Sequence, residues 1–143
     1  MDDQTPRVMR IIRGILIGML VDLFISLVFS LLLGVALALW LSNTGIPNHE
    51  LGDAMIEAAL QSPWLLISTI GGSIASIIAG FIAANIIQYN YSNYLGIMGT
   101  SLALVSLSGF QGYLEPNLAL FFALLTFLSV MAGGWLYSWA TNN

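Results

Sequence analysis

Asp22 is the residue of this sequence with the clearest chemical potential, because it is the one acidic or basic side chain inside a long apolar run. The run covers residues 14–41, and three arginines (Arg7, Arg10 and Arg13) come just before it. A carboxylate inside a membrane is costly, and such residues commonly serve proton relays, ion pathways or pairing with another charge. Asp22 is therefore the first candidate for a functional site.

Two amides, Asn85 and Gln88, are the predicted neighbours of Asp22. They end a second apolar segment, 64–88, which runs back across the membrane and brings them to a similar depth. A hydrogen-bonded cluster of the three side chains has three interpretations: a clamp between helices, a proton- or cation-coupling site, or a socket for an arginine or lysine in a partner's span. The sequence alone leaves all three open.

Catalytic, cofactor and metal sites have no comparable support. His49 is the single histidine, only Glu50 and Asp53 stand near it in sequence, and the chain has no cysteine. This is a poor donor set for a metal, and nothing positions a serine to form a catalytic triad with His49. We expect no enzyme activity, no cofactor and no metal, and the net charge of −4 argues against nucleic acid as a partner.

The composition indicates that the chain lies in a membrane. Charged residues make up 7% of it and hydrophobic residues 58%, whereas soluble domains carry about 25% charged residues. Segments of about 20 apolar residues cross a bilayer, and four qualify: 14–41, 64–88, 94–113 and 117–139. We predict an all-α integral membrane protein, a four-transmembrane-helix bundle that forms a single domain over residues 1–143. The first segment is too long for a signal peptide and is predicted to be retained.

The charges and aromatic residues predict the orientation. The three arginines before the first span favour a cytoplasmic N-terminus, and an even number of spans returns the C-terminus to the same side. Aromatic residues, which favour membrane interfaces, agree: Trp40, Trp64 and Tyr113 fall at outer ends, and Tyr89, Tyr91, Tyr94, Trp135, Tyr137 and Trp139 at inner ends. We predict a multi-pass protein of the cell (inner or plasma) membrane with both termini in the cytoplasm.

The outer connection between the first two spans predicts a short amphipathic helix over residues 48–62. Asn48 can cap this helix and Pro63 can end it. Its apolar and acidic side chains fall on different faces, with Leu51, Met55, Ala58 and Ala59 on one and Glu50, Asp53 and Glu57 on the other. Such a helix is typical of a membrane surface, and binding of a partner protein is the alternative.

Small residues recur at every fourth position in the first two spans. The first span carries Gly14, Gly18, Asp22, Ser26, Ser30, Gly34 and Ala38; the second carries two adjacent rows, Gly72, Ser76, Gly80, Ala84 and Gln88, and Gly71, Ala75, Ala79 and Ala83. Small residues let helices approach closely in lipid. We expect the two spans to pack along these stripes, with Asp22 near Ala84 or Gln88 and Ala38 near Gly72. Self-association through one row, or a pore lined by Ser26, Ser30 and Ser76, is the alternative.

These observations favour a non-catalytic small integral membrane protein. It would assemble through its small-residue stripes as a homo-oligomer or as an accessory subunit of a larger membrane complex. The alternative is a small oligomeric channel or proton- or cation-coupled carrier that uses Asp22 with Asn85 and Gln88. A second alternative is a lipid-interacting envelope protein that acts through its surface helix. The expected partners are the lipid bilayer and either the chain itself or another membrane protein.

Overall fold

The computed structural model describes residues 5–47, 49–109 and 112–142, and within them it contains five helices and no strand. The helices are α1 (Thr5–Asn43), α2 (Leu51–Ala59), α3 (Trp64–Ile87), α4 (Tyr91–Gly109) and α5 (Pro116–Asn142). The predicted all-α fold is therefore confirmed, with a short helix between the first two long ones.

Three of the described helices are long and apolar enough to cross a membrane: α1 over Arg7–Asn43, α3 over Trp64–Ile87 and α5 over Pro116–Asn142. The 19-residue helix α4 is not among them, because its four serines, Asn93 and Thr100 lower its hydropathy. The structure thus supports a membrane protein with at least these three apolar helices.

Several helix boundaries differ from the predicted ones, and the segment predicted over 94–113 is the helix Tyr91–Gly109. The first helix begins at Thr5 instead of residue 14, because arginine is a good helix former and lets the helix continue back through the charged segment. The amphipathic helix, predicted over 48–62, covers only Leu51–Ala59. Its predicted cap, Asn48, lies outside the described residues.

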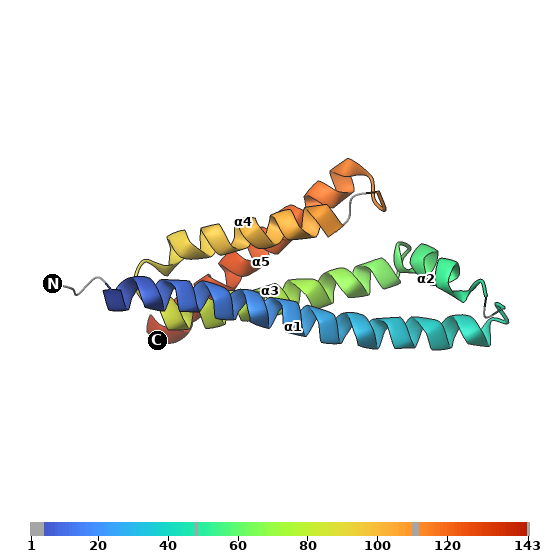
Figure 1. The fold of residues 1–143 in the computed structure, drawn as a ribbon, viewed down its shortest axis with the longest axis horizontal. Helices are drawn as coiled ribbons and strands as arrows, with labels where there is room; N and C mark the ends of the chain where they lie inside the picture. Colours follow the sequence, from blue (N-terminus) through green and yellow to red (C-terminus); the bar gives the residue numbers. More distant parts are fainter. Residues whose placement is uncertain (1–4, 48, 110–111, 143) are drawn as a thin grey trace.

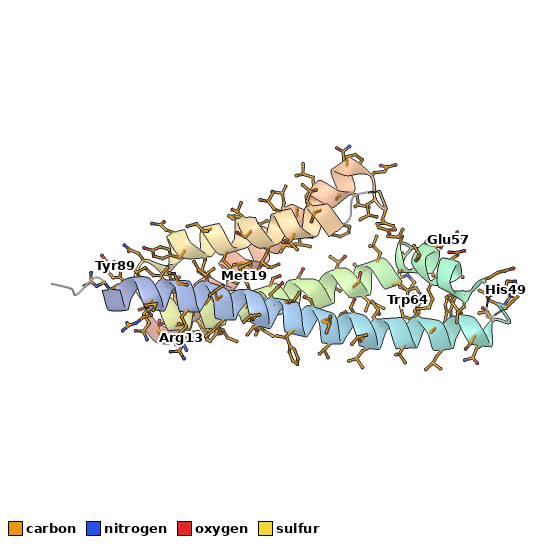
Figure 2. The ribbon with its side chains drawn as sticks, in the orientation of Figure 1. Arg13, Met19, His49, Glu57, Trp64 and Tyr89 are labelled. Carbon is orange, nitrogen blue, oxygen red and sulfur yellow. The ribbon has the colours of Figure 1, made fainter. Side chains whose placement is uncertain are left out.

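The long helices form two antiparallel pairs that meet at one end and diverge at the other. Figure 1 shows α1 beside α3 and α4 beside α5, with the two pairs together near the start of α1 and apart near α2. We call these the closed end and the open end. Figure 2 shows Arg13 and Tyr89 toward the closed end, and His49, Glu57 and Trp64 toward the open end.

The closed end is filled by a core of small and medium-sized side chains from α3, α4 and α5. This cluster consists of Ala79, Ala83, Ala84, Leu95, Met98, Leu102 and Val130, and Ile15, Met19 and Val21 of α1 pack against it. A Cβ on Gly18 would meet Ala83 and Met98, so α1 also approaches this core closely. The described residues therefore seal this half of the bundle with apolar atoms.

Polar and aromatic contacts also join the helices at the closed end. The guanidinium of Arg7 lies 5.5 Å from the ring centre of Tyr89, which is a cation–π distance. Arg10 Nη1 donates a hydrogen bond to Gln88 Oε1 at 3.5 Å. The ring of Tyr137 makes edge contacts with Phe81 and Tyr91, so α5 is joined to α3 and α4 near its end.

A backbone crossing between α3 and α5 sets the angle at which the two helix pairs diverge. A Cβ on Gly80 would strike the carbonyl oxygen of Val130, and a Cβ on Gly133 would strike the carbonyl oxygen of Ile77. Paired glycines of this kind let two helices touch along their backbones. Because α3 and α5 cross at this contact, α5 and its neighbour α4 diverge from α1 and α3 toward the open end (Figure 1).

At the open end, α2 packs beside the last turns of α1. Leu37 and Leu41 are buried there, and the rings of Trp40 and Trp64 lie 5.9 Å apart. No described residue of α2 itself is buried. The role of α2 as a lipid-contacting surface helix stays a prediction.

Candidate functional site

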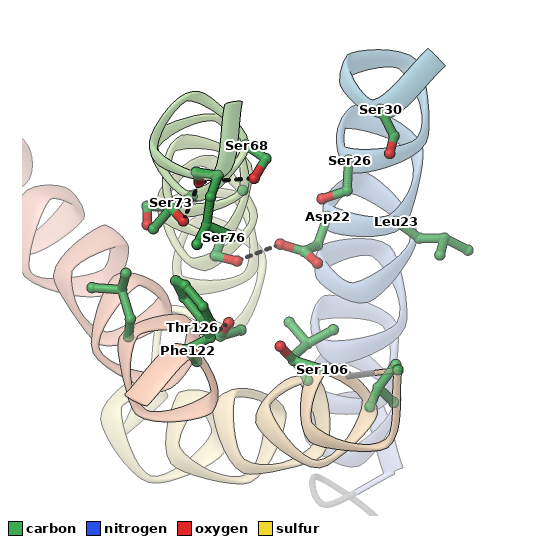
Figure 3. A pocket seen from close by; sticks show the side chains of 17 residues that line it. Asp22, Leu23, Ser26, Ser30, Ser68, Ser73, Ser76, Ser106, Phe122 and Thr126 are labelled. Atoms are coloured by element: carbon green, nitrogen blue, oxygen red, sulfur yellow. Dashed lines mark hydrogen bonds between the residues drawn. The ribbon is translucent and has the colours of Figure 1, made fainter. Parts of the chain in front are cut away.

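The divergence of the two helix pairs leaves a cleft between them with a volume of about 490 Å³. All four long helices contribute to its walls (Figure 3). The lining residues are Asp22, Leu23, Ser26, Ser30, Leu65, Ser68, Thr69, Gly72, Ser73, Ser76, Leu102, Val105, Ser106, Gly109, Phe122, Leu125 and Thr126. The apolar core begins at Leu102, next to Asp22 and Ser76. In the described part of the chain, this core closes one end of the cleft.

The two walls of the cleft differ in chemistry. Six of the eight hydroxyl side chains that the described residues contribute come from α1 and α3, and Ser106 and Thr126 come from the other pair. The wall formed by α4 and α5 is mostly apolar, with Leu102, Val105, Phe122 and Leu125. The cleft is thus amphiphilic, with a hydroxyl wall facing a hydrocarbon wall.

Asp22 lies at the closed end of this cleft. Only 9% of its surface is exposed, and Ser76 Oγ donates a hydrogen bond to its Oδ1 at 2.7 Å. The other carboxylate oxygen makes no hydrogen bond within the described part of the chain. Figure 3 shows the Asp22 and Ser76 side chains pointing toward each other across the gap between α1 and α3. Among the described residues that line the cleft, Asp22 is the only charged one.

Apart from Ser76, which donates to Asp22, the described hydroxyls of the cleft fall into two groups. Ser68, Thr69 and Thr126 donate to carbonyl oxygens one turn back in their own helices, at 2.9, 2.7 and 3.0 Å. Four others (Ser26, Ser30, Ser73 and Ser106) make no hydrogen bond to any described residue. A hydroxyl can both donate and accept, so these four are available to water or to a bound ligand.

The structure does not bring Asn85 or Gln88 to Asp22. Asn85 is exposed, and Gln88 accepts its hydrogen bond from Arg10 at the closed end. The predicted register was wrong because it aligned the start of α3 with the end of α1. In the structure α2 occupies the space beside the last turns of α1, and α3 is displaced toward the closed end, so that Ser76 faces Asp22.

Residues of the small-residue stripes pack against more than one helix in the structure. A Cβ on Gly14 would meet Ile87 and Ala83, and one on Gly71 would meet the ring of Phe29, so these glycines lie between α1 and α3. The row of α3 that contains Gly72 and Gly80 faces α5 at Gly80, where an added Cβ would strike Val130. The stripe residues that are buried are Gly14, Gly18, Gly71, Ala75, Ser76, Ala79, Gly80, Ala83 and Ala84. Both rows of α3 thus contact helices of the same chain.

Toward the open end, several stripe residues are not packed closely against another helix. A Cβ on Gly34 or Gly72 would have no atom within 4 Å, and Ser26, Ser30 and Ala38 are not buried. The predicted contact of Ala38 with Gly72 is absent for the same reason as the predicted Asp22 cluster, namely the shifted register. Gly72 instead lines the cleft.

His49 lies far from this cleft. Its Nε2 is 3.3 Å from Glu50 Oε1, and both side chains are mostly exposed. Among the described residues no group of three or more His, Cys, Asp or Glu side chains is placed to hold a metal ion.

Most of the cleft hydroxyls were not predicted as site residues. The spacing of Thr69, Gly72, Ser73 and Ser76 is i, i+3, i+4, i+7, which defines one face of a helix. This pattern in the sequence places hydroxyls on the same face as Ser76. It could have identified the polar wall, although not the partner that it faces.

Comparison with known proteins finds no matching family model, no similar curated protein and no similar solved structure. The function is therefore argued from the cleft itself.

Proposed function

We propose that this protein is a small membrane carrier that binds a cation or a proton at Asp22 inside the cleft. The observation that carries the proposal is the position of Asp22, a carboxylate at the closed end of a cleft lined with available hydroxyls. A buried intramembrane acid next to water-accessible polar groups is the usual arrangement of proton and cation coupling sites. The cleft is closed by the apolar core beyond it, which favours a carrier over a permanently open channel.

The proposed topology is a four-span bundle with both termini in the cytoplasm. Arg7, Arg10 and Arg13 stand at the closed end, and positively charged flanks stay inside. The acidic residues Glu50, Asp53, Glu57 and Glu115 belong to the two connections that this topology places outside. The open end of the cleft then faces the outside of the cell. Asp22 lies about 13 Å along the helix from Arg13, near the depth at which transporters place their binding sites.

The helix α4 is the proposed fourth span. Its 19 residues reach about 28 Å, close to the ~30 Å hydrocarbon thickness of a bilayer. Several of its hydroxyls are already bonded: Thr100, Ser101 and Ser108 donate to carbonyl oxygens in the same helix at 2.8, 3.0 and 2.8 Å. Satisfied hydroxyls lower the cost of placing this helix in lipid.

Labelling of single cysteines tests this topology, and the absence of native cysteine makes it direct. In intact cells a membrane-impermeant maleimide is expected to label Thr44→Cys and Glu115→Cys. Ser92→Cys and Thr141→Cys are expected to react only after the membrane is permeabilised. Labelling of Glu115→Cys and Ser92→Cys from the same side would show that α4 does not cross.

Transport into proteoliposomes tests the function. Liposomes that contain the protein should take up a cation, or collapse a proton gradient, faster than protein-free liposomes. The Asp22→Asn variant should lose this activity. Equal rates in the wild-type and Asp22→Asn proteins would contradict the proposal.

A second candidate function is assembly as a homo-oligomer or an accessory subunit. It is supported by Gly34, which lies on the small-residue stripe of α1 and leaves open space beside its backbone. Small residues of this kind are common at helix–helix interfaces in membranes. Native mass spectrometry of the gently solubilised protein tests it: a defined oligomer or a stoichiometric partner that is lost in Gly34→Leu supports assembly, and a monomer argues against it.

A further inference from the structure

We propose that the ligand of the cleft is a monovalent organic cation with an apolar body, such as an alkyl- or arylammonium compound. This inference rests on the proposed function and assigns the chemical class of the ligand. It follows from three properties of the cleft: its single charge, its hydrocarbon wall and its size.

The charge of the cleft matches one positive charge. Of the described residues in the cleft only Asp22 is charged, and one of its carboxylate oxygens already accepts a hydrogen bond from Ser76. Protein sites for Ca²⁺ use six to eight oxygen ligands, and those for Zn²⁺ use several cysteine, histidine or carboxylate ligands; among the described residues no group of three or more His, Cys, Asp or Glu side chains is placed to hold a metal ion. One carboxylate oxygen with nearby hydroxyls can receive an ammonium group, which needs one counter-charge and a few acceptors.

The hydrocarbon wall favours an organic cation over an inorganic one. Leu102, Val105 and Leu125 stand on the side of the cleft opposite the hydroxyl wall. They have no oxygen to replace the hydration shell of a small inorganic ion, but they can bury carbon groups. Phe122 also lines this wall (Figure 3), and aromatic faces attract quaternary ammonium groups.

The size of the cleft agrees with this assignment. Its volume of about 490 Å³ falls within the range of roughly 300–1,000 Å³ that is typical of small-molecule sites. A bare monovalent ion would leave most of this space to water in contact with the apolar wall. An ammonium group at Asp22 with its carbon body against Val105 and Phe122 would use both walls.

Binding of benzyltrimethylammonium to the protein in nanodiscs tests the proposal. Its neutral isostere, neopentylbenzene, has the same shape without the charge, and empty nanodiscs correct for partitioning into lipid. We expect saturable binding of the cation but not of the isostere. Asp22→Asn should weaken binding at least tenfold, or about 1.4 kcal/mol, because it removes the one counter-charge for the trimethylammonium group, which has no N–H and is held by charge attraction alone.

A pair of glycine variants tests the location independently of Asp22. A Cβ added at Gly72 or at Gly96 would have no atom within 4 Å, so both variants should fold, but only Gly72 lines the cleft. Gly72→Leu should therefore weaken binding of benzyltrimethylammonium at least tenfold, and Gly96→Leu should leave it unchanged.

The outcomes separate the ligand class from the function. Loss of binding in Asp22→Asn and Gly72→Leu, with normal binding in Gly96→Leu, supports the organic cation. If sodium or proton flux depends on Asp22 but benzyltrimethylammonium does not bind, the ligand class is wrong and the carrier function stands. If the isostere binds as well as the cation, or Gly72→Leu binds normally, the ligand class is also overturned. Asp22-independent flux would overturn the function itself.

Discussion

Asp22→Asn is expected to reduce transport into proteoliposomes to less than a tenth of the wild-type rate. Asparagine has nearly the same shape, and its side-chain oxygen can still accept the hydrogen bond from Ser76. The variant therefore removes the charge and keeps the packing between α1 and α3. Loss of a charge-assisted contact worth about 1.5–3 kcal/mol corresponds to roughly a 10- to 150-fold loss of affinity for the cation.

Two further measurements show whether such a loss comes from the site or from misfolding. Asp53→Asn removes an exposed carboxylate of α2 that does not line the cleft, and it should transport normally. The thermal stability of Asp22→Asn should stay close to that of the wild type, because asparagine keeps the shape of the side chain and an oxygen that accepts the hydrogen bond from Ser76. A variant that stays folded and transports at the full rate would leave Asp22 with only a structural role.

Gly80→Leu is expected to unfold the bundle or to prevent it from forming. The new Cβ would strike the backbone carbonyl of Val130, and a backbone atom cannot rotate away as a side chain can. Overpacking of a tight site usually costs about 1–3 kcal/mol, and a clash with backbone should lie at or above the upper limit. Gly133→Leu should have the same effect from the other side of the crossing. The fraction of folded protein during titration with sodium dodecyl sulfate measures both.

Gly72→Leu is the matched control for this experiment. It lies in the same helix and on the same small-residue stripe as Gly80, two turns away, yet it has no atom within 4 Å of an added Cβ. Its free energy of unfolding should stay within about 0.5 kcal/mol of the wild type, as for most substitutions away from tight contacts. Equal destabilisation by Gly72→Leu and Gly80→Leu would show that α3 and α5 do not cross as described.

The sequence was sufficient to predict the helices but not how they align. Long apolar runs define spans by length alone, so α3 and α5 were predicted to within a few residues. The alignment of α1 with α3 depends on α2, which takes the place beside the last turns of α1 near Leu37 and Leu41. Because an every-fourth-residue stripe repeats along the helix, it permits several registers and selects none of them.

The cleft could not be predicted from the sequence, for a related reason. Asp22 could be predicted to face another helix because it shares a face with Gly18 and Ser26. The open space beside it exists because α3 and α5 cross at Gly80 and Gly133, and this crossing joins residues that are far apart in the chain. No local pattern contains the angle of such a crossing.

The most direct test of the account is whether water reaches the cleft from outside the cell. Single cysteines can be placed in this chain, which has none of its own. Ser30→Cys and Ser73→Cys put a thiol in the cleft. As controls, Leu27→Cys puts a thiol on the exposed face of α1, away from the cleft, and Ala79→Cys puts one in the buried core. A membrane-impermeant methanethiosulfonate reacts with thiolates, which form only in contact with water, so the two cleft cysteines should react at least about tenfold faster than the other two. Equal, slow reaction at all four positions would show that the cleft is filled by lipid or protein and would contradict a carrier site at Asp22.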